Sequence, residues 1–97
     1  MSNKALQLAY LNAIYPGWEP EYRFHKTRKW RLDYGNPKRK LAVEIEGGIW
    51  IKGRHTTGSG FKKDIEKYNT LASMGWLLFR CTPSDFFNIG EYLSEVI

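Results

Sequence analysis

The spacing of apolar side chains along the chain predicts three helices. Apolar residues recur every three or four positions between residues 3 and 15, where a Pro-Gly pair follows and ends the helix. The same period returns over residues 61–72, and a glycine soon after this segment supplies a C-terminal stop. A last helix is predicted from residue 82 to residue 96, opened by a Thr-Pro-Ser sequence.

Between these helices the period changes to the alternation that is typical of strands. Residues 21–24 and 30–34 alternate apolar and polar side chains, which predicts a hairpin joined through basic residues. Gly35-Asn36-Pro37 is then expected to form a turn. A third strand is predicted over residues 41–46, and the nearly all-apolar segment 76–81 indicates a fourth strand buried on both faces.

The predicted order αβββαβα defines an α/β fold. A three-stranded meander, a crossover helix and a fourth strand favour a mixed four-stranded sheet flanked by helices, in one domain that covers residues 1–97. No apolar run approaches the roughly 20 residues that span a bilayer, and the N-terminus lacks the pattern of a signal peptide. The single cysteine, Cys81, excludes an internal disulfide. We therefore expect a soluble, intracellular protein with no membrane association.

Positive charge is concentrated in one part of the chain. Residues 23–40 hold eight lysines and arginines against a single acid, within a net charge of +5 for the whole protein. Such a block is the expected footprint of a polyanion such as DNA, although a solvated basic hairpin without a ligand is the alternative. The candidate DNA-binding residues, including two from the glycine-rich loop at residues 47–60, are Arg23, Lys26, Arg28, Lys29, Arg31, Lys52 and Arg54.

Three acids are expected to gather on the sheet. Glu44 and Glu46 lie two apart on a strand and so point the same way, and Asp33 is predicted to end the neighbouring antiparallel strand. Crowded carboxylates repel each other unless a cation lies between them, and oxygen ligands suit Mg²⁺ or Mn²⁺. Such an ion acidifies bound water and stabilises charge on a phosphate. The alternative is structural: glutamates on the solvent face of an edge strand, paired with arginines, and an aspartate in a turn.

Two further segments carry groups suited to acid–base or phosphate chemistry. His55, in the glycine-rich loop, would act as a general acid or base or bind phosphate, unless it is an ordinary surface residue. Asp64 and Lys67 lie three apart on one side of the second predicted helix. They form either a surface charge group with Lys63 or an acid and an ammonium placed over the site.

The segments RKWRLDYGNPKRKLAVEIEGGIW, GRHTTGSGF and DIEKYNTLASMGWLLFRCTP resemble the PD-(D/E)XK nuclease superfamily. The likeness is strongest to very-short-patch-repair endonucleases and to small phage and mobile-element domains, some of them homing endonucleases. It implies a restriction-endonuclease-like fold and an Mg²⁺-dependent DNA endonuclease, without a small-molecule cofactor. Asp33, Glu44 and the carbonyl group of Ile45 match the metal ligands, His55 the loop histidine of the repair branch, and Asp64 the acid of homing-type relatives.

One position departs from the family pattern. The superfamily usually has lysine two residues after the strand acid, where this chain has Glu46. The role of that lysine passes to His55, Lys67 or Lys63, or the domain is inactive. Glu19 or, better, Glu21 is a candidate for an additional acidic ligand. The expected catalytic set is Asp33, Glu44, Glu46, His55, Asp64 and Lys67.

Two other function classes stay open on the sequence alone. One is a nucleic-acid-binding module without catalysis, and the other is an interaction domain whose basic hairpin docks an acidic protein. A homodimer is also expected, because so short a chain builds a small core and cutting two strands takes either two sites or one site that rebinds. The aromatic residues expected to pack between subunits are Tyr10, Tyr15, Trp18, Phe86, Phe87 and Tyr92.

Overall fold

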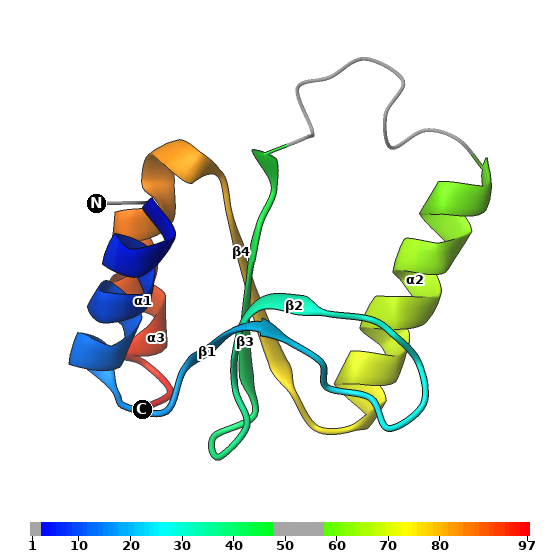
Figure 1. Ribbon diagram of the computed structural model, residues 1–97, viewed down its shortest axis with the longest axis horizontal. Helices are drawn as coiled ribbons and strands as arrows, with labels where there is room; N and C mark the ends of the chain where they lie inside the picture. The colour runs from blue at the N-terminus through cyan, green and yellow to red at the C-terminus, as the bar shows by residue number, and fades with distance from the viewer. Residues whose placement is uncertain (1–2, 48–57) are drawn as a thin grey trace.

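Four short strands form one mixed sheet between helices (Figure 1). The computed structural model describes residues 3–47 and 58–97. Its elements are α1 (Asn3–Ile14), β1 (Glu19–Tyr22), β2 (Leu32–Asn36), β3 (Leu41–Ile45), α2 (Gly58–Ser73), β4 (Leu77–Cys81), the 3-10 helix η2 (Pro83–Asn88) and α3 (Ile89–Leu93). The predicted α/β class and the order of helices and strands are thereby confirmed. No helix in these ranges is long and apolar enough to cross a membrane.

The strand order β1-β2-β3-β4 makes β3 a central strand. Strands β1 and β2, and likewise β2 and β3, pair antiparallel, whereas β4 returns through α2 and pairs parallel to β3. Helix α1, η2 and α3 cover one face of the sheet and α2 covers the other (Figure 1). A residue near the end of β3 is therefore enclosed by strands on both sides and by a helix on each face.

Each face of the sheet carries its own apolar cluster. The cluster under α1, η2 and α3 consists of Leu11, Trp18, Tyr34, Leu41, Val43, Cys81, Phe86, Ile89 and Leu93. The cluster under α2 consists of Phe24, Leu32, Ala42, Leu71 and Trp76. Apolar side chains on both faces of one sheet are typical of a three-layer arrangement.

The predicted turn at Gly35-Asn36-Pro37 is wrong, because the first two of these residues belong to β2. Strand pairing sets Glu19 opposite Gly35, and the Tyr22 ring lies over this glycine, so that an added Cβ atom would lie 2.9 Å from the ring. Asn36 is fully buried and its amide group donates to the carbonyl oxygen of Pro16, at 3.1 Å. Glycine and asparagine are thus selected here by close packing and a buried hydrogen bond, and not by turn geometry.

Two further expectations about the strands and the last helix need correction. Strand β4 is an edge strand. It is not buried on both faces, because Leu77 is 50% exposed. The predicted last helix is divided into η2 and α3, and η2 itself is kinked at Asp85, whose dihedral angles are non-helical. Phe24 and Trp30 lie outside the strands and stack on each other in the connection between β1 and β2.

The terminal aromatic residues mainly complete the core. Trp18 and Phe86 are buried against the sheet, and Tyr10 packs against both Phe86 and Phe87. Only Phe87 and Tyr92 in this group are exposed large side chains. The homodimer therefore stays a prediction, and Trp18 and Phe86 do not contribute to its surface.

Candidate active site

Strands β2 and β3 separate where their two acids meet. Their register is regular as far as the pair Tyr34–Val43. Beyond it, the backbone N–H of Asp33 donates to Oε2 of Glu44 at 2.7 Å, and the N–H of Ile45 donates to Oδ2 of Asp33, also at 2.7 Å. Side-chain carboxylates thus take the place of main-chain carbonyl groups as acceptors. The two acids expected to approach each other are brought together.

Strand β2 is distorted at Asp33. Leu32 packs in the cluster under α2, whereas Tyr34 packs in the cluster on the opposite face. Side chains two positions apart on a regular strand share a face, so the backbone changes course between these residues. Asp33 lies near the start of β2, and not at its end as predicted. The two strands are antiparallel, so a residue opposite the end of β3 must lie near the start of β2.

Glu44 is the buried acid of this site, with 7% of its surface exposed. Its Oε1 atom accepts a hydrogen bond from the Tyr68 hydroxyl at 2.6 Å and lies 3.2 Å from the Lys67 ammonium. Both partners come from α2. The alternative that Glu44 faces solvent from an edge strand is wrong, because β3 is central and three donors surround the carboxyl group of Glu44.

The carboxyl group of Asp33 lies in a negative environment. Burial raises its pKa, the hydrogen bond from the Ile45 N–H opposes this effect, and the charges of Glu44 and Glu21 raise the pKa further. An aspartate that lies beside two other acids in this way favours either a proton on its carboxyl group or a cation nearby. Of the two candidates for an additional acidic ligand, Glu21 is therefore the one whose charge acts on Asp33. The sequence pattern also favours it over Glu19.

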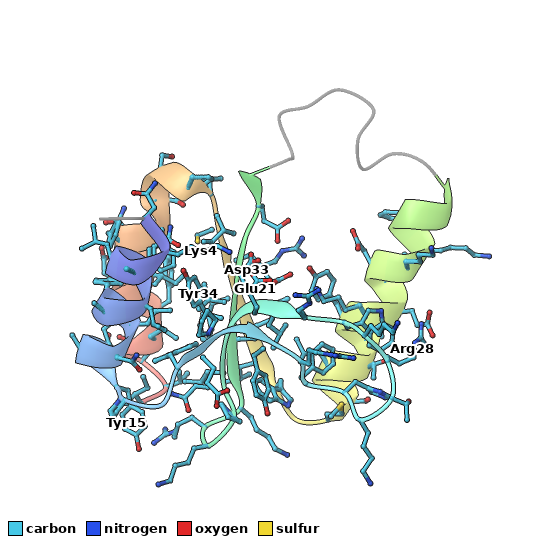
Figure 2. The ribbon with its side chains drawn as sticks, in the orientation of Figure 1. Lys4, Tyr15, Glu21, Arg28, Asp33 and Tyr34 are labelled. Atoms are coloured by element: carbon cyan, nitrogen blue, oxygen red, sulfur yellow. The ribbon has the colours of Figure 1, made fainter. Side chains whose placement is uncertain are left out.

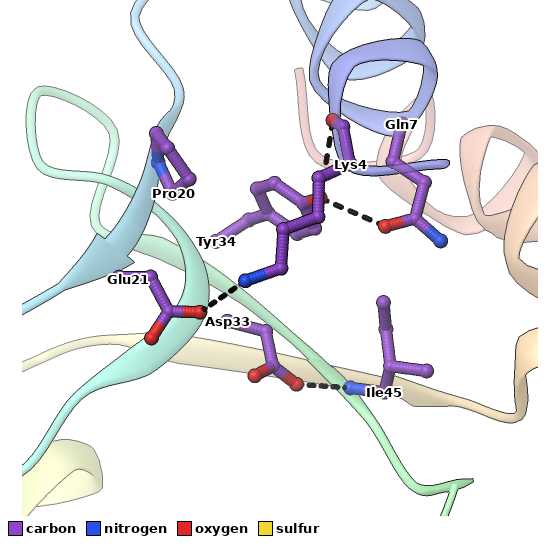
Figure 3. A pocket seen from close by; sticks show the side chains of 7 residues that line it. All are labelled: Lys4, Gln7, Pro20, Glu21, Asp33, Tyr34 and Ile45. Atoms are coloured by element: carbon purple, nitrogen blue, oxygen red, sulfur yellow. Dashed lines mark hydrogen bonds and ion pairs between the residues drawn. The ribbon is translucent and has the colours of Figure 1, made fainter. Parts of the chain in front are cut away.

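A pocket of about 160 Å³ opens beside Asp33, on the α1 side of the sheet (Figure 3). Across it the Lys4 ammonium lies 3.1 Å from Glu21, and the Tyr34 hydroxyl donates to Oε1 of Gln7 at 2.8 Å. The lining residues are Lys4, Gln7, Pro20, Glu21, Asp33, Tyr34 and Ile45. Nothing in the sequence singles out Lys4 or Gln7 except their spacing of three residues, which puts both on one side of α1.

Glu46 is held apart from the pair of acids. Its carboxylate lies 3.2 Å from Nε of Arg80, and the Arg80 guanidinium lies 5.2 Å from the centre of the Tyr68 ring. The charges of Glu44 and Glu46 both raise the pKa of Tyr68, in addition to burial and its hydrogen bond. Both glutamates therefore lie on the α2 side, as their spacing predicts, with Glu46 neutralised by an arginine.

The remaining expected site residues divide into three groups. Lys67 reaches the site, whereas Asp64 is exposed one turn earlier on α2 and makes no ion pair among the described residues. His55, with Lys52 and Arg54, lies outside the described residues. In residues 3–47 and 58–97 no group of three or more acidic, histidine or cysteine side chains is arranged to hold a metal.

Asp33 and Glu44 nevertheless offer a donor set that fits a hard divalent cation. In Asp33, Oδ2 accepts a hydrogen bond from a described residue and Oδ1 accepts none. In Glu44, Oε2 accepts a single hydrogen bond from a described residue. Lone pairs on both carboxylates thus remain available. Mg²⁺ usually takes one or two protein carboxylates and completes its shell with water and phosphate oxygens.

The basic segment between β1 and β2 is folded against α2. Arg28 makes a bidentate ion pair with Glu66, at 2.6 and 3.1 Å, and stacks 4.0 Å above the Trp30 ring. Figure 2 shows Arg28 beside α2, away from Asp33. Lys26 and Lys29 are exposed and have no ion-pair partner among the described residues. Arg28 therefore fixes the segment, while the two lysines are left for solvent or a ligand.

Other bases of the charged block have separate partners. Arg31 lies 3.7 Å from Glu21. Arg39 and Lys40, in the turn between β2 and β3, donate to the main-chain carbonyl groups of Val96 and Met74. Arg23 is exposed, without an ion pair in the described part of the chain. The bases that are contiguous in the sequence are thus divided among separate partners.

Comparison of the chain with protein-family models, curated proteins and solved structures finds no match. The resemblance to PD-(D/E)XK nucleases therefore rests on the motifs of the sequence.

Proposed function

We propose that this protein is a metal-dependent DNA endonuclease of the restriction-endonuclease-like kind. The observation that carries the proposal is the ionisable carboxylate of Glu44, buried on the central strand beside Asp33 and 3.2 Å from Lys67. Desolvating an ion pair costs several kcal/mol per ion, and apolar residues of similar volume are often at least as stable. A buried acid with a second acid and a lysine therefore calls for a functional explanation.

The site residues have distinct roles in this proposal. Asp33, Glu44 and the carbonyl oxygen of Ile45 would hold Mg²⁺ or Mn²⁺. Such an ion, when bound, supplies an acidified water and stabilises charge on a phosphate. Lys67 takes the place of the family's strand lysine, because Glu46 occupies that position and is paired with Arg80. Its ammonium lies 3.2 Å from Oε1 of Glu44 and would contact a phosphate oxygen. The role of His55 stays a prediction.

The exposed bases would provide affinity without sequence readout. Arg23, Lys26 and Lys29 are free to contact phosphates from the segment that Arg28 holds against α2. Cutting both strands of a duplex takes two copies of the site or one that rebinds, and the proposal takes the first route, through a homodimer. Light scattering at micromolar concentration would then give twice the mass of one chain.

A non-catalytic DNA-binding module is the second candidate. It is favoured by the finding that both acids accept main-chain N–H groups at 2.7 Å, which is a structural role in itself. In that case the carboxylates would only close the gap between β2 and β3.

Incubation of purified protein with supercoiled plasmid separates the two candidates. The nuclease proposal predicts nicked or linear product with Mg²⁺ and none with EDTA. Binding is measured on the same DNA in Ca²⁺. Salt-dependent binding without cleavage in Mg²⁺ or Mn²⁺ would support the module and overturn the nuclease. Cleavage that EDTA leaves unchanged would overturn the metal assignment.

A further inference from the structure

Tyr68 lies at the centre of the polar group on the α2 side of the sheet. Its hydroxyl donates to Oε1 of Glu44 at 2.6 Å, and its ring lies 5.1 Å from the Lys67 ammonium and 5.2 Å from the Arg80 guanidinium. Arg80 in turn binds Glu46. One tyrosine therefore touches the site acid, its lysine and the arginine that neutralises the second glutamate.

We propose that Tyr68 is a positioning residue that orients Glu44 for binding a divalent cation. The inference rests on the proposed function and adds a residue that the sequence pattern marks only as an apolar position of the helix over residues 61–72. Tyr68 is partly buried beside the cluster under α2, so its ring has a packing role as well. The positioning role belongs to the hydroxyl group.

The geometry explains why the hydroxyl should matter for the cation. Oε1 of Glu44 is shared by Tyr68 and Lys67, which leaves Oε2 directed toward Asp33. A hydrogen bond to a carboxylate at 2.6 Å is short and charge-assisted. Without it, Oε2 of Glu44 keeps the N–H of Asp33, but Oε1 is held by Lys67 alone, whose long side chain is a flexible tether.

The test is calorimetric titration of the full-length protein with Mn²⁺, comparing the wild type with Tyr68→Phe and Tyr10→Phe. Tyr68→Phe keeps the ring and its contacts but removes the donor to Glu44. Tyr10→Phe is a matched control on the opposite face of the sheet. The Tyr10 hydroxyl donates to the carbonyl oxygen of Phe87 at 2.8 Å and accepts the N–H of Gly90 at 3.0 Å. Thermal unfolding of each variant reports any general loss of stability.

Loss of an outer partner of a metal-binding carboxylate typically costs about 10- to 100-fold in affinity. We expect Tyr68→Phe to weaken Mn²⁺ binding by that factor and Tyr10→Phe to leave it unchanged. The Mg²⁺ concentration for half-maximal cleavage should rise in parallel, with the maximal rate retained within a few-fold. Wild-type Mn²⁺ affinity in Tyr68→Phe, or an equal loss in Tyr10→Phe, would overturn the positioning role alone. A wild-type protein that binds no Mn²⁺ would overturn the metal site itself.

Discussion

The ion pair between Glu44 and Lys67 should be strongly coupled because it is buried. Its side chains are only 9% and 15% exposed, at an N–O distance of 3.2 Å. With an effective dielectric constant of about 20, two charges at this distance attract each other by about 5 kcal/mol. Desolvation of both groups offsets much of this attraction, and interacting pairs show couplings of about 0.5–3 kcal/mol. We expect about 2 kcal/mol here, toward the upper part of that range.

A double-mutant cycle measures this coupling. Urea unfolding is followed for the wild type, Glu44→Gln, Lys67→Met and the double variant, in buffer without divalent cations. Each single change leaves a buried group without its partner and should destabilise the fold by about 3 kcal/mol. The double variant should lose clearly less than the sum of the two.

The pair Glu46–Arg80 is a control with the same separation and a different exposure. Its N–O distance is also 3.2 Å, but the side chains are 21% and 54% exposed. Exposed pairs contribute about 0–1 kcal/mol, so the cycle through Glu46→Gln and Arg80→Met should give a coupling below 1 kcal/mol. Equal couplings for the two pairs, or less than about 0.5 kcal/mol for Glu44–Lys67, would refute the role of burial.

Three other changes test separate parts of the structure. Asp33→Asn should raise the melting temperature at neutral pH by a few degrees, corresponding to about 0.5–1 kcal/mol. The raised pKa of Asp33 means that stability falls as pH rises through it, so the gain should vanish in acid, and a lower melting temperature at neutral pH would contradict this. Replacing Lys26 and Lys29 with alanine should flatten the salt dependence of DNA binding by up to about 0.9 log units per lost contact, and an unchanged slope would place the DNA elsewhere. Gly35→Ala should destabilise by about 1–3 kcal/mol, because its Cβ would lie 2.9 Å from Tyr22, and a neutral effect in urea unfolding would show that the ring moves freely.

Periodicity predicted the layers of this fold because each helix and strand buries one face or both. It placed Glu44 and Glu46 on the same side of β3 for the same reason. It could not predict the distortion of β2 at Asp33, where side-chain acceptors replace main-chain ones. That distortion depends on a hydrogen bond between strands, and the spacing of residues along one strand carries no information about it.

The charges were predicted as a group, but their partners were not. A run of bases in the sequence indicates a polyanion ligand, yet Arg28 is bound to Glu66, which lies 38 positions away. Tyr68 falls at one of the apolar positions that predict the helix over residues 61–72, and its hydroxyl partner comes from a distant strand. Long-range pairing of polar atoms decides which residues of a motif are free to act, and a single sequence does not record it.

The central claim is that Asp33 and Glu44 form the centre of a metal-dependent phosphodiesterase. It is tested most directly by the single-turnover rate at which excess protein nicks a supercoiled plasmid in Mg²⁺, compared between the wild type and Asp33→Asn. A metal ion supplies several kcal/mol of transition-state stabilisation, and about 4 kcal/mol corresponds to about a thousandfold in rate. We predict a loss of that order in Asp33→Asn with DNA binding retained, and none in Glu91→Gln, an exposed acid on α3. Cleavage by Asp33→Asn at the wild-type rate would contradict the claim.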